Sequence, residues 1–318
     1  MSPLNLTRVL ILDPELGFAR LAARLAELGW TPADAGQATA PAVAGEPALA
    51  TWSRGGHKPH LVYSCNPVAW LRVLDMDTCP PLLRGLIANA LPWLDQDALV
   101  QRLYTPAAET RLHAIWGLTE LEALDALDAI AALGTDTEPL VADAAARAVE
   151  RLAAIAEARA ETMAALTTVA QAAEPVVRGL DNPAFTRTLM PAREDCLALF
   201  DAPFADALLP LLAELARRPP RLAPGGRLSE LAIHAANAGL LRFPNPASAP
   251  FPTGWRDIAP WLLPAPVWLC WRWSTPGERA GVTGDGLVWV NGRWVWLPKL
   301  PRRMAPLLAE TLHPHGLH

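Results

Sequence analysis

The residues of this sequence best suited to metal binding or proton transfer are its seven histidines. His57 and His60 stand three residues apart, but Pro59 between them prevents one helix from presenting both imidazoles on the same face. Three more crowd the C-terminus, where they would hold a metal ion only adventitiously: His313, His315 and His318. The spacing of these histidines therefore predicts no metal site.

The remaining candidates for chemistry are isolated side chains. His113 and His234 each stand alone on an expected helix, where a histidine is usually exposed or a satisfied part of the core. Two carboxylate pairs, at positions 120/122 and 194/195, are explained as helix caps or solvated side chains. The sequence contains no GxxxxGK[ST], GxGxxG, GxSxG or HExxH motif. We therefore predict no catalytic residue and no cofactor.

Composition excludes several classes of partner. Hydrophobic residues make up 52% of the 318 positions and charged residues 19%, and the net charge is −5, so the chain lacks the basic face of a nucleic-acid binder. The four cysteines are widely spaced and form no CxxC pair, which excludes a zinc ribbon or redox motif. The N-terminal residues do not resemble a secretion signal, and no apolar run approaches about 18 residues. These features predict a cytoplasmic protein that binds neither nucleic acid nor a membrane.

The elements that must position any site begin with two helix pairs between Asp97 and Ala154. In each, an apolar helical stripe is followed by a break and a second helix, and the breaks at Thr105 and Thr137 lie about one repeat apart. The second helices, ETRLHAIWGLTEL and VADAAARAVERLAA, combine small residues with leucines and an arginine near the turn. Further helices are expected over 82–91, 155–179, 196–200, 205–217 and 228–241.

These two segments resemble the second helices of HEAT-like repeats. The resemblance covers about two repeats and implies a mainly α fold, a HEAT-like α-solenoid that presents an extended protein-binding surface. A generic antiparallel helix bundle remains the alternative, since helices rich in alanine and leucine are common.

Before the helices, residues 1–80 predict a small α/β cap. A strand at Val9–Leu12 precedes a helix that ends near Gly29, and a hairpin is expected from 51 to 64 around Gly55-Gly56. The opening is superficially similar to a receiver domain, but Pro14 follows Asp13, and the next strand offers no aspartate to accept phosphate. A cap on the open end of the solenoid is the better interpretation.

After the helices, a proline-rich stretch at 243–254 predicts a linker, and 255–318 contains eight of the thirteen tryptophans. Asn291-Gly292 predicts a two-residue hairpin turn that would pair Trp289 with Trp294 and Leu287 with Trp296. These tryptophans are either core or an exposed binding platform. The segment from Trp255 carries seven Arg/Lys and four Asp/Glu, so it could meet an acidic partner.

The sequence thus predicts four parts: an α/β cap (1–80), a HEAT-like region (81–242), a linker (243–254) and a Trp-rich β-containing segment (255–318). The leading hypothesis is a non-enzymatic protein–protein interaction or scaffold protein. The alternatives are an accessory or immunity protein of a bacterial secretion or conflict system, and a HEAT-like enzyme such as a lyase or DNA glycosylase. Eight residues are candidates for contact with a protein partner: Arg111, His113, Trp116, Arg147, Trp289, Trp294, Trp296 and Arg302.

Overall fold

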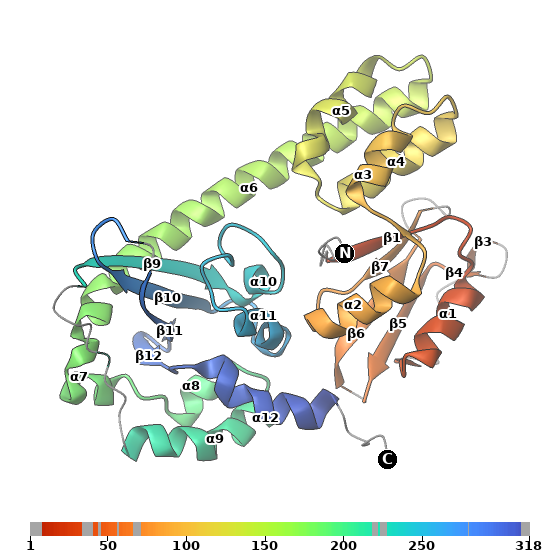
Figure 1. Cartoon of the computed structure of the whole chain (residues 1–318). Helices are drawn as coiled ribbons and strands as arrows, with labels where there is room; N and C mark the ends of the chain where they lie inside the picture. Colours follow the sequence, from red (N-terminus) through yellow and green to blue (C-terminus); the bar gives the residue numbers. More distant parts are fainter. Residues whose placement is uncertain are drawn as a thin grey trace. The chain divides into compact units, whose positions relative to one another are not determined.

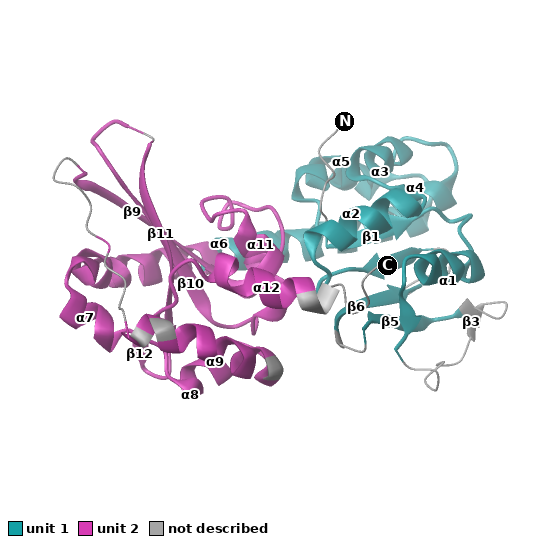
Figure 2. Ribbon diagram, turned by 60° about the horizontal axis from the view of Figure 1, so that its bottom comes forward, with its two compact units in different colours: residues 1–161 teal, residues 162–318 magenta. Residues whose placement is uncertain are grey.

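A computed structural model of the chain divides it into two compact units, residues 1–161 and 162–318 (Figures 1 and 2). The structure describes residues 8–33, 41–43, 46–55, 57–65, 71–217, 222, 228–278 and 280–312. Gly56 of the expected hairpin turn lies outside the described residues, as do the three C-terminal histidines His313, His315 and His318. Each unit combines helices with an antiparallel sheet, so the class is mixed α/β.

Among the described residues, unit 1 contains eight strands, two 3₁₀ helices and six α-helices, the last of which, α6, continues into unit 2. Its elements are β1 (Val9–Leu12), α1 (Phe18–Glu27), β2 (Thr31–Pro32), β3 (Pro41–Val43), β4 (Glu46–Pro47), β5 (Leu49–Arg54), β6 (His57–Ser64), β7 (Arg72–Asp75), α2 (Pro81–Ala90), β8 (Trp93–Leu94), α3 (Gln96–Arg102), α4 (Ala108–Glu120), η1 (Leu124–Ala126), α5 (Leu127–Ala131), η2 (Ala132–Thr135) and α6 (Pro139–Arg178).

The eight strands of unit 1 form a six-stranded antiparallel sheet, in the order β2-β5-β6-β7-β1-β8, and the separate short pair β3-β4. Strand β1 is buried on both faces, which explains its uninterrupted apolar sequence, VLIL. Its residues Val9 and Ile11 join a core built with α3, α4 and the first part of α6. Leu10 pairs with Leu74 and thereby faces the opposite side, where α1 packs on the sheet.

Unit 2 contains a four-stranded antiparallel sheet in the order β12-β11-β10-β9, with helices packed against it. Its elements are η3 (Gly179–Asp181), α7 (Pro183–Thr188), α8 (Arg193–Leu197), α9 (Ala202–Arg217), β9 (Glu230–Asn237), α10 (Ala238–Leu241), α11 (Gly254–Ile258), η4 (Ala259–Trp261), β10 (Val267–Ser274), β11 (Gly281–Val290), β12 (Arg293–Trp296) and α12 (Leu300–Leu312).

The core of unit 2 is built around tryptophans. Trp268 on β10 contacts Trp255 of α11, with ring centroids 5.1 Å apart, and Trp271 contacts Trp296 at 6.2 Å. The last part of α6 belongs to the same core through four residues on one side of the helix: Leu166, Ala170, Ala173 and Val177. The sheet of unit 2 therefore has apolar contacts on both faces.

The predicted HEAT-like α-solenoid is wrong. A solenoid repeat requires a turn after about residue 154, but α6 is one continuous helix of 40 residues from Pro139 to Arg178. The sequence after Ala154 is rich in alanine, glutamate and arginine, which favour helix, and it contains no glycine or proline before Pro175. The first helix expected in the second pair is also broken, into η1, α5 and η2.

The first helix pair does form, but it packs on a sheet instead of on another repeat. Helices α3 and α4 lie side by side, and α4 contacts β1 (Figure 1). Gly117 permits this contact, because a Cβ there would lie 3.1 Å from Leu99 and 3.3 Å from Ile11. The small residues that resembled a repeat family thus serve helix-to-sheet packing.

The helix expected over 228–241 is also wrong. Residues 230–237 form β9, which pairs with β10 over its whole length, and only the short α10 follows. The proline-rich stretch at 243–254 lies within unit 2. Ala247 and Phe251 are buried there, and the Asn245 side chain donates to the carbonyl oxygens of Leu240 and Phe243 at 2.6 and 2.8 Å.

The hairpins are confirmed. The β11-β12 register pairs Trp289 with Trp294 and Leu287 with Trp296, and Asn291 and Gly292 have φ values of 50° and 73°. These positive values are those that a type I′ turn requires. The β5-β6 hairpin and the strand at Val9–Leu12 are present as well.

Gly286 lies inside β11. The register with β10 shifts there, because Leu287 pairs with Leu269 whereas Asp285 pairs with Cys270. Gly286 is the extra residue and has a φ of +84°. It forms a bulge that brings the β11 backbone against the carbonyl group of Leu297.

No helix in the described ranges is both long and apolar enough to cross a bilayer.

We predict that Gly286→Ala destabilises unit 2 by about 3 kcal/mol or more. An added Cβ would lie 2.0 Å from the carbonyl oxygen of Leu297, and the positive φ adds strain. The matched control is Gly277→Ala, which has a φ of +80° but no atom within 4 Å of the added Cβ, and should cost about 1 kcal/mol. Urea unfolding followed by tryptophan fluorescence measures both, and equal losses would contradict the close approach at Gly286.

Candidate functional site

The four candidate contact residues of unit 1 do not form a common surface. Arg111 is mostly buried and binds both oxygens of Asp136 at 2.8 and 2.9 Å. It also donates to the carbonyl oxygens of Thr105 and Pro106, each at 2.8 Å, and thus fixes two turns to each other. The Arg111 hydrogen bonds are the main reason that the pKa of Asp136 is lowered. The Arg111 side chain therefore stabilises the fold of unit 1 through contacts within the chain.

His113 is 3% exposed, so its imidazole faces the core of unit 1. Burial lowers the pKa of His113 to about 4, with a further decrease from Arg102 and an opposing effect of Asp13. The ring is therefore neutral at pH 7. Trp116 is partly buried against the same core, and Arg147 is exposed and pairs with Asp143 one turn away at 2.8 Å.

The candidate residues of unit 2 are partly brought together. Trp289 is 50% exposed, and its ring meets the edge of Trp294 at a centroid distance of 5.2 Å and an angle of 74°. Trp294 is partly buried, whereas Trp296 is 3% exposed and donates from Nε1 to the carbonyl oxygen of Asp285 at 3.0 Å. Arg302 is exposed on α12. The hairpin thus combines a core tryptophan with an exposed aromatic pair.

The turn beside this pair is fixed by Asp195, one of the carboxylates expected to cap a helix. Its Oδ2 accepts from the backbone N–H of Ala192 at 2.9 Å, which caps α8, and it forms an ion pair with Arg293. Its Oδ1 accepts from Asn291 Nδ2 at 3.1 Å. Arg293 also donates to the carbonyl oxygen of Met190 at 2.9 Å. A buried carboxylate therefore holds the hairpin turn in one geometry.

The pKa of Asp195 reflects two opposing effects. Burial favours the neutral carboxyl and would raise the pKa. The hydrogen bonds from Ala192, Arg293 and Asn291 favour the carboxylate, and together they outweigh burial, so that the pKa is lowered.

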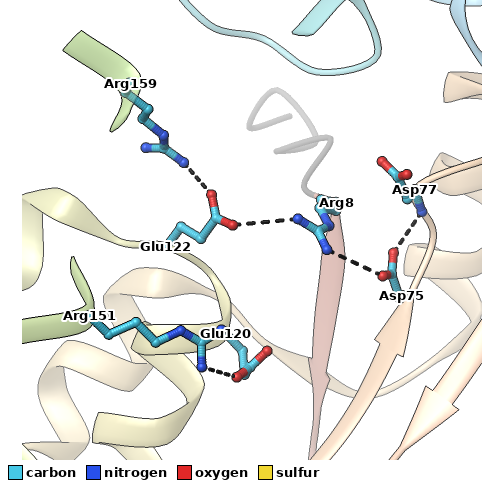
Figure 3. Close-up of polar contacts among 7 residues, drawn as sticks. All are labelled: Arg8, Asp75, Asp77, Glu120, Glu122, Arg151 and Arg159. Atoms are coloured by element: carbon cyan, nitrogen blue, oxygen red, sulfur yellow. Dashed lines mark hydrogen bonds and ion pairs between the residues drawn. The ribbon is translucent and has the colours of Figure 1, made fainter. Parts of the chain in front are cut away.

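A cluster of charged groups joined by ion pairs lies in unit 1, on a face of the sheet (Figure 3). Strand register places Val9 beside Asp75, and Asp75 beside Val62, so these three side chains share one face. Glu120, the last residue of α4, and Glu122, just after it, join them in lining a pocket of about 160 Å³. The floor of this pocket is apolar and its walls are charged.

Ion pairs connect the walls of this pocket. Arg8 lies 3.7 Å from Asp75 and 3.4 Å from Glu122, and Glu122 also binds Arg159 of α6. Glu120 pairs with Arg151 of α6 at 2.9 Å. The carboxylates 120 and 122 had been expected to cap or face solvent, but they join α6 and β1 to the end of α4.

Two residues of the cluster depart from ordinary behaviour. Glu122 has a φ of 51°, a region that a residue with a side chain rarely adopts. Burial raises the pKa of Asp75, against the opposing effects of its hydrogen bond from Asp77 N–H and of Arg8. Strained backbone and perturbed carboxyl groups are both enriched at functional sites, so this pocket is a candidate site.

The arrangement favours a structural role over catalysis. Each arginine of the cluster is already paired with a carboxylate, and the contacts span elements that must pack together. Among the described residues, no group of three His, Cys, Asp or Glu side chains is placed to hold a metal ion. Sequence reasoning missed the cluster because strand register, which places Asp75 beside Val9, cannot be read from isolated charges.

The comparisons with known proteins identify no relative: no family model matches the chain, and no curated protein or solved structure is significantly similar to it.

We predict that Asp75→Asn raises the melting temperature at pH 7. The pKa of Asp75 is higher in the folded than in the unfolded state, so ionisation of this carboxyl lowers the free energy of unfolding. The loss of stability grows as the pH rises from the unfolded to the folded pKa. The gain should therefore shrink as the pH falls to about 4. Thermal unfolding over this range measures it, with the exposed Asp125→Asn as control. A lower melting temperature than wild type at pH 7 would show that pairing with Arg8 outweighs burial.

We predict that Asp195→Ala destabilises unit 2 by roughly 2 kcal/mol at pH 7, because it removes charged hydrogen bonds to Ala192, Asn291 and Arg293. Since the pKa of Asp195 is lowered in the folded state, its contribution is complete above the ordinary aspartate pKa of about 3.9. The stabilisation by Asp195 is lost as the pH falls through its pKa in the folded state, so the free energies of unfolding of the wild type and the variant should become equal in acid. Glu194→Ala, at the exposed neighbour, is the control for urea unfolding.

Proposed function

We infer that this chain is a non-enzymatic protein-binding protein, and that Trp289 is the anchor of a contact surface on unit 2. The observation that supports this inference is the exposure of half of the Trp289 side chain on a hairpin with a fixed turn. A large aromatic side chain that is already ordered loses little conformational entropy on binding. Tryptophan is accordingly among the residues most enriched at binding hot spots.

The surroundings of Trp289 supply order and charge. The Trp294 ring supports one side of it, and the adjacent turn is held by Asp195. The segment from Trp255 has more basic than acidic residues, so an acidic partner surface is favoured. A net charge of −5 for the whole chain favours protein over nucleic acid as the partner.

We place this interaction in the cytoplasm. The four cysteines all belong to the described residues, are buried and form no disulfide, which suits a reducing compartment. Burial raises the pKa of three of these thiols, Cys79, Cys196 and Cys270, and so disfavours the reactive thiolate.

We predict that Trp289→Ala weakens binding of the partner by about tenfold or more, because truncation of a hot-spot tryptophan costs roughly 2 kcal/mol or more. The full-length protein, immobilised and exposed to an extract of the organism that encodes it, should retain a stoichiometric protein that the variant loses. Calorimetric titration with the recovered partner then gives the ratio of affinities.

The matched control is Tyr104→Ala, which removes an aromatic side chain that is 69% exposed in unit 1. It should retain the partner as wild type does. Equal affinity of the wild type and Trp289→Ala for the recovered protein would contradict the proposed surface, provided that both have the same far-ultraviolet circular dichroism.

A further inference from the structure

A second recognition feature of unit 2 is a groove of about 240 Å³ between α6 and β9. Its floor includes Leu166 and Ala170 from the helix and Ile233 and Ala235 from the strand. Leu166, Ala170 and Ala235 are buried, whereas Ile233 is partly exposed. Polar side chains and a loop complete the lining: Thr167, Gln171, Glu174, His234, Pro246, Ala247 and Pro250. A volume of this size accommodates one or two aliphatic side chains, at roughly 100 Å³ or more for each.

The groove reaches the edge of the sheet. Ile233, His234 and Ala235 all line it, although consecutive side chains of a strand point to opposite faces. Three consecutive residues can line the same groove only if it runs along the main chain at the edge of the strand, where both faces meet. β9 is the last strand of its sheet, so its groups on this side face away from β10.

Within the described residues, Leu231–Ala236 make main-chain hydrogen bonds only inside the sheet. Every second residue of an antiparallel edge strand turns its N–H and C=O outward. β9 therefore offers a row of hydrogen-bonding groups beside a groove that is lined by both apolar and polar side chains. This combination recognises an extended peptide, whose main chain pairs with the edge while alternate side chains enter pockets.

The charges around the groove indicate the composition of that peptide. Glu174 lines the groove, but its carboxylate is already paired with Arg178 at 2.7 Å, so the negative charge offered to a partner is that of the exposed Glu230 at the start of β9. Burial lowers the pKa of His234, and Arg272 lowers it further, so this imidazole adds no positive charge at neutral pH. Arg178 pairs with Glu174 and lies over the Trp273 ring, which places Glu174 near the Leu231 end of β9.

We propose that the free edge of β9 and the adjoining α6 groove bind an extended segment of a partner protein that carries aliphatic residues flanked by lysine or arginine. The segment adds a strand beside β9, an aliphatic side chain enters the groove, and a basic residue meets Glu230. This site is separate from the Trp289 surface, so loss of either leaves the other to be tested on its own.

The test begins with a displayed library of random peptides about as long as β9, selected on the full-length protein. Ile233→Asp, which places a charge in the groove, serves for counter-selection. Peptides that prefer the wild type should contain aliphatic residues flanked by lysine or arginine. Failure to enrich any peptide over the Ile233→Asp protein, or enrichment of acidic peptides, would overturn the proposal.

Methionine methyl signals locate the binding site of the best enriched peptide. Met163 lines the groove and is 38% exposed, whereas Met76 and Met304 are buried elsewhere. In protein labelled at the methionine methyl groups, the peptide should shift the Met163 signal, identified by its loss in Met163→Leu, and leave those of Met76 and Met304 unchanged. A peptide that binds without moving the Met163 signal would place the site outside the groove.

Backbone and charge recognition are separated by two further changes. Two versions of the peptide are made, one methylated on the odd-numbered and one on the even-numbered backbone nitrogens. Only one of these sets donates hydrogen bonds to the edge of β9, so one version should lose about tenfold or more in affinity. Glu230→Lys should weaken binding by about threefold or more, while Glu194→Lys, on α8, should not. Unchanged affinity of both methylated versions would exclude strand addition, and self-association lost in Glu230→Lys would identify a second copy as the occupant and overturn the proposal.

Discussion

One continuous helix contributes to two separate hydrophobic cores in this protein. The first part of α6 packs through Ala144, Ala148 and Leu152 into the core of unit 1, and its last part packs through Leu166 and Ala170 into that of unit 2. Alanine on the packed face lets other elements approach the helix closely in both units. The apolar face of α6 is therefore the constraint on which the helical layer of unit 1 and the groove of unit 2 both depend.

Local signals in the sequence were sufficient wherever one short-range rule decides the structure. Asn291-Gly292 fixed a hairpin and its register, since few other residues tolerate two successive positive φ values. The strand at Val9–Leu12 and the helix after it followed from apolar patterning. By contrast, residues 230–237 form a strand because β10 lies beside them, and even the nearest paired residues, Asn237 and Val267, are 30 positions apart in the chain.

The solenoid prediction failed because alanine-rich helices pack equally well on helices and on sheets. Gly117 and the residues around it could have faced another repeat, but they contact Ile11 of β1. The candidate site residues also divide into those placed by local sequence and those placed by the packing of distant elements. Trp289 is exposed at the end of a correctly predicted hairpin, whereas Arg111 and His113 were assigned to a surface that the fold turns inward. Asp75 and its neighbours depend on strand register and could not be found from spacing alone.

The middle of α6 has a different character from its two ends. Between Leu152 and Leu166 no residue is buried, and several of the side chains there are alanines in full contact with solvent. This stretch is held as a helix by its own backbone hydrogen bonds and by the high helical propensity of its residues. Ile155 still packs on the core of unit 1, and Arg159 pairs with Glu122, so the part of the helix that packs into neither core is residues 156–165. Local unfolding of that part should cost less than unfolding of either unit. A break of the helix at this point would leave the residues of both hydrophobic cores in place.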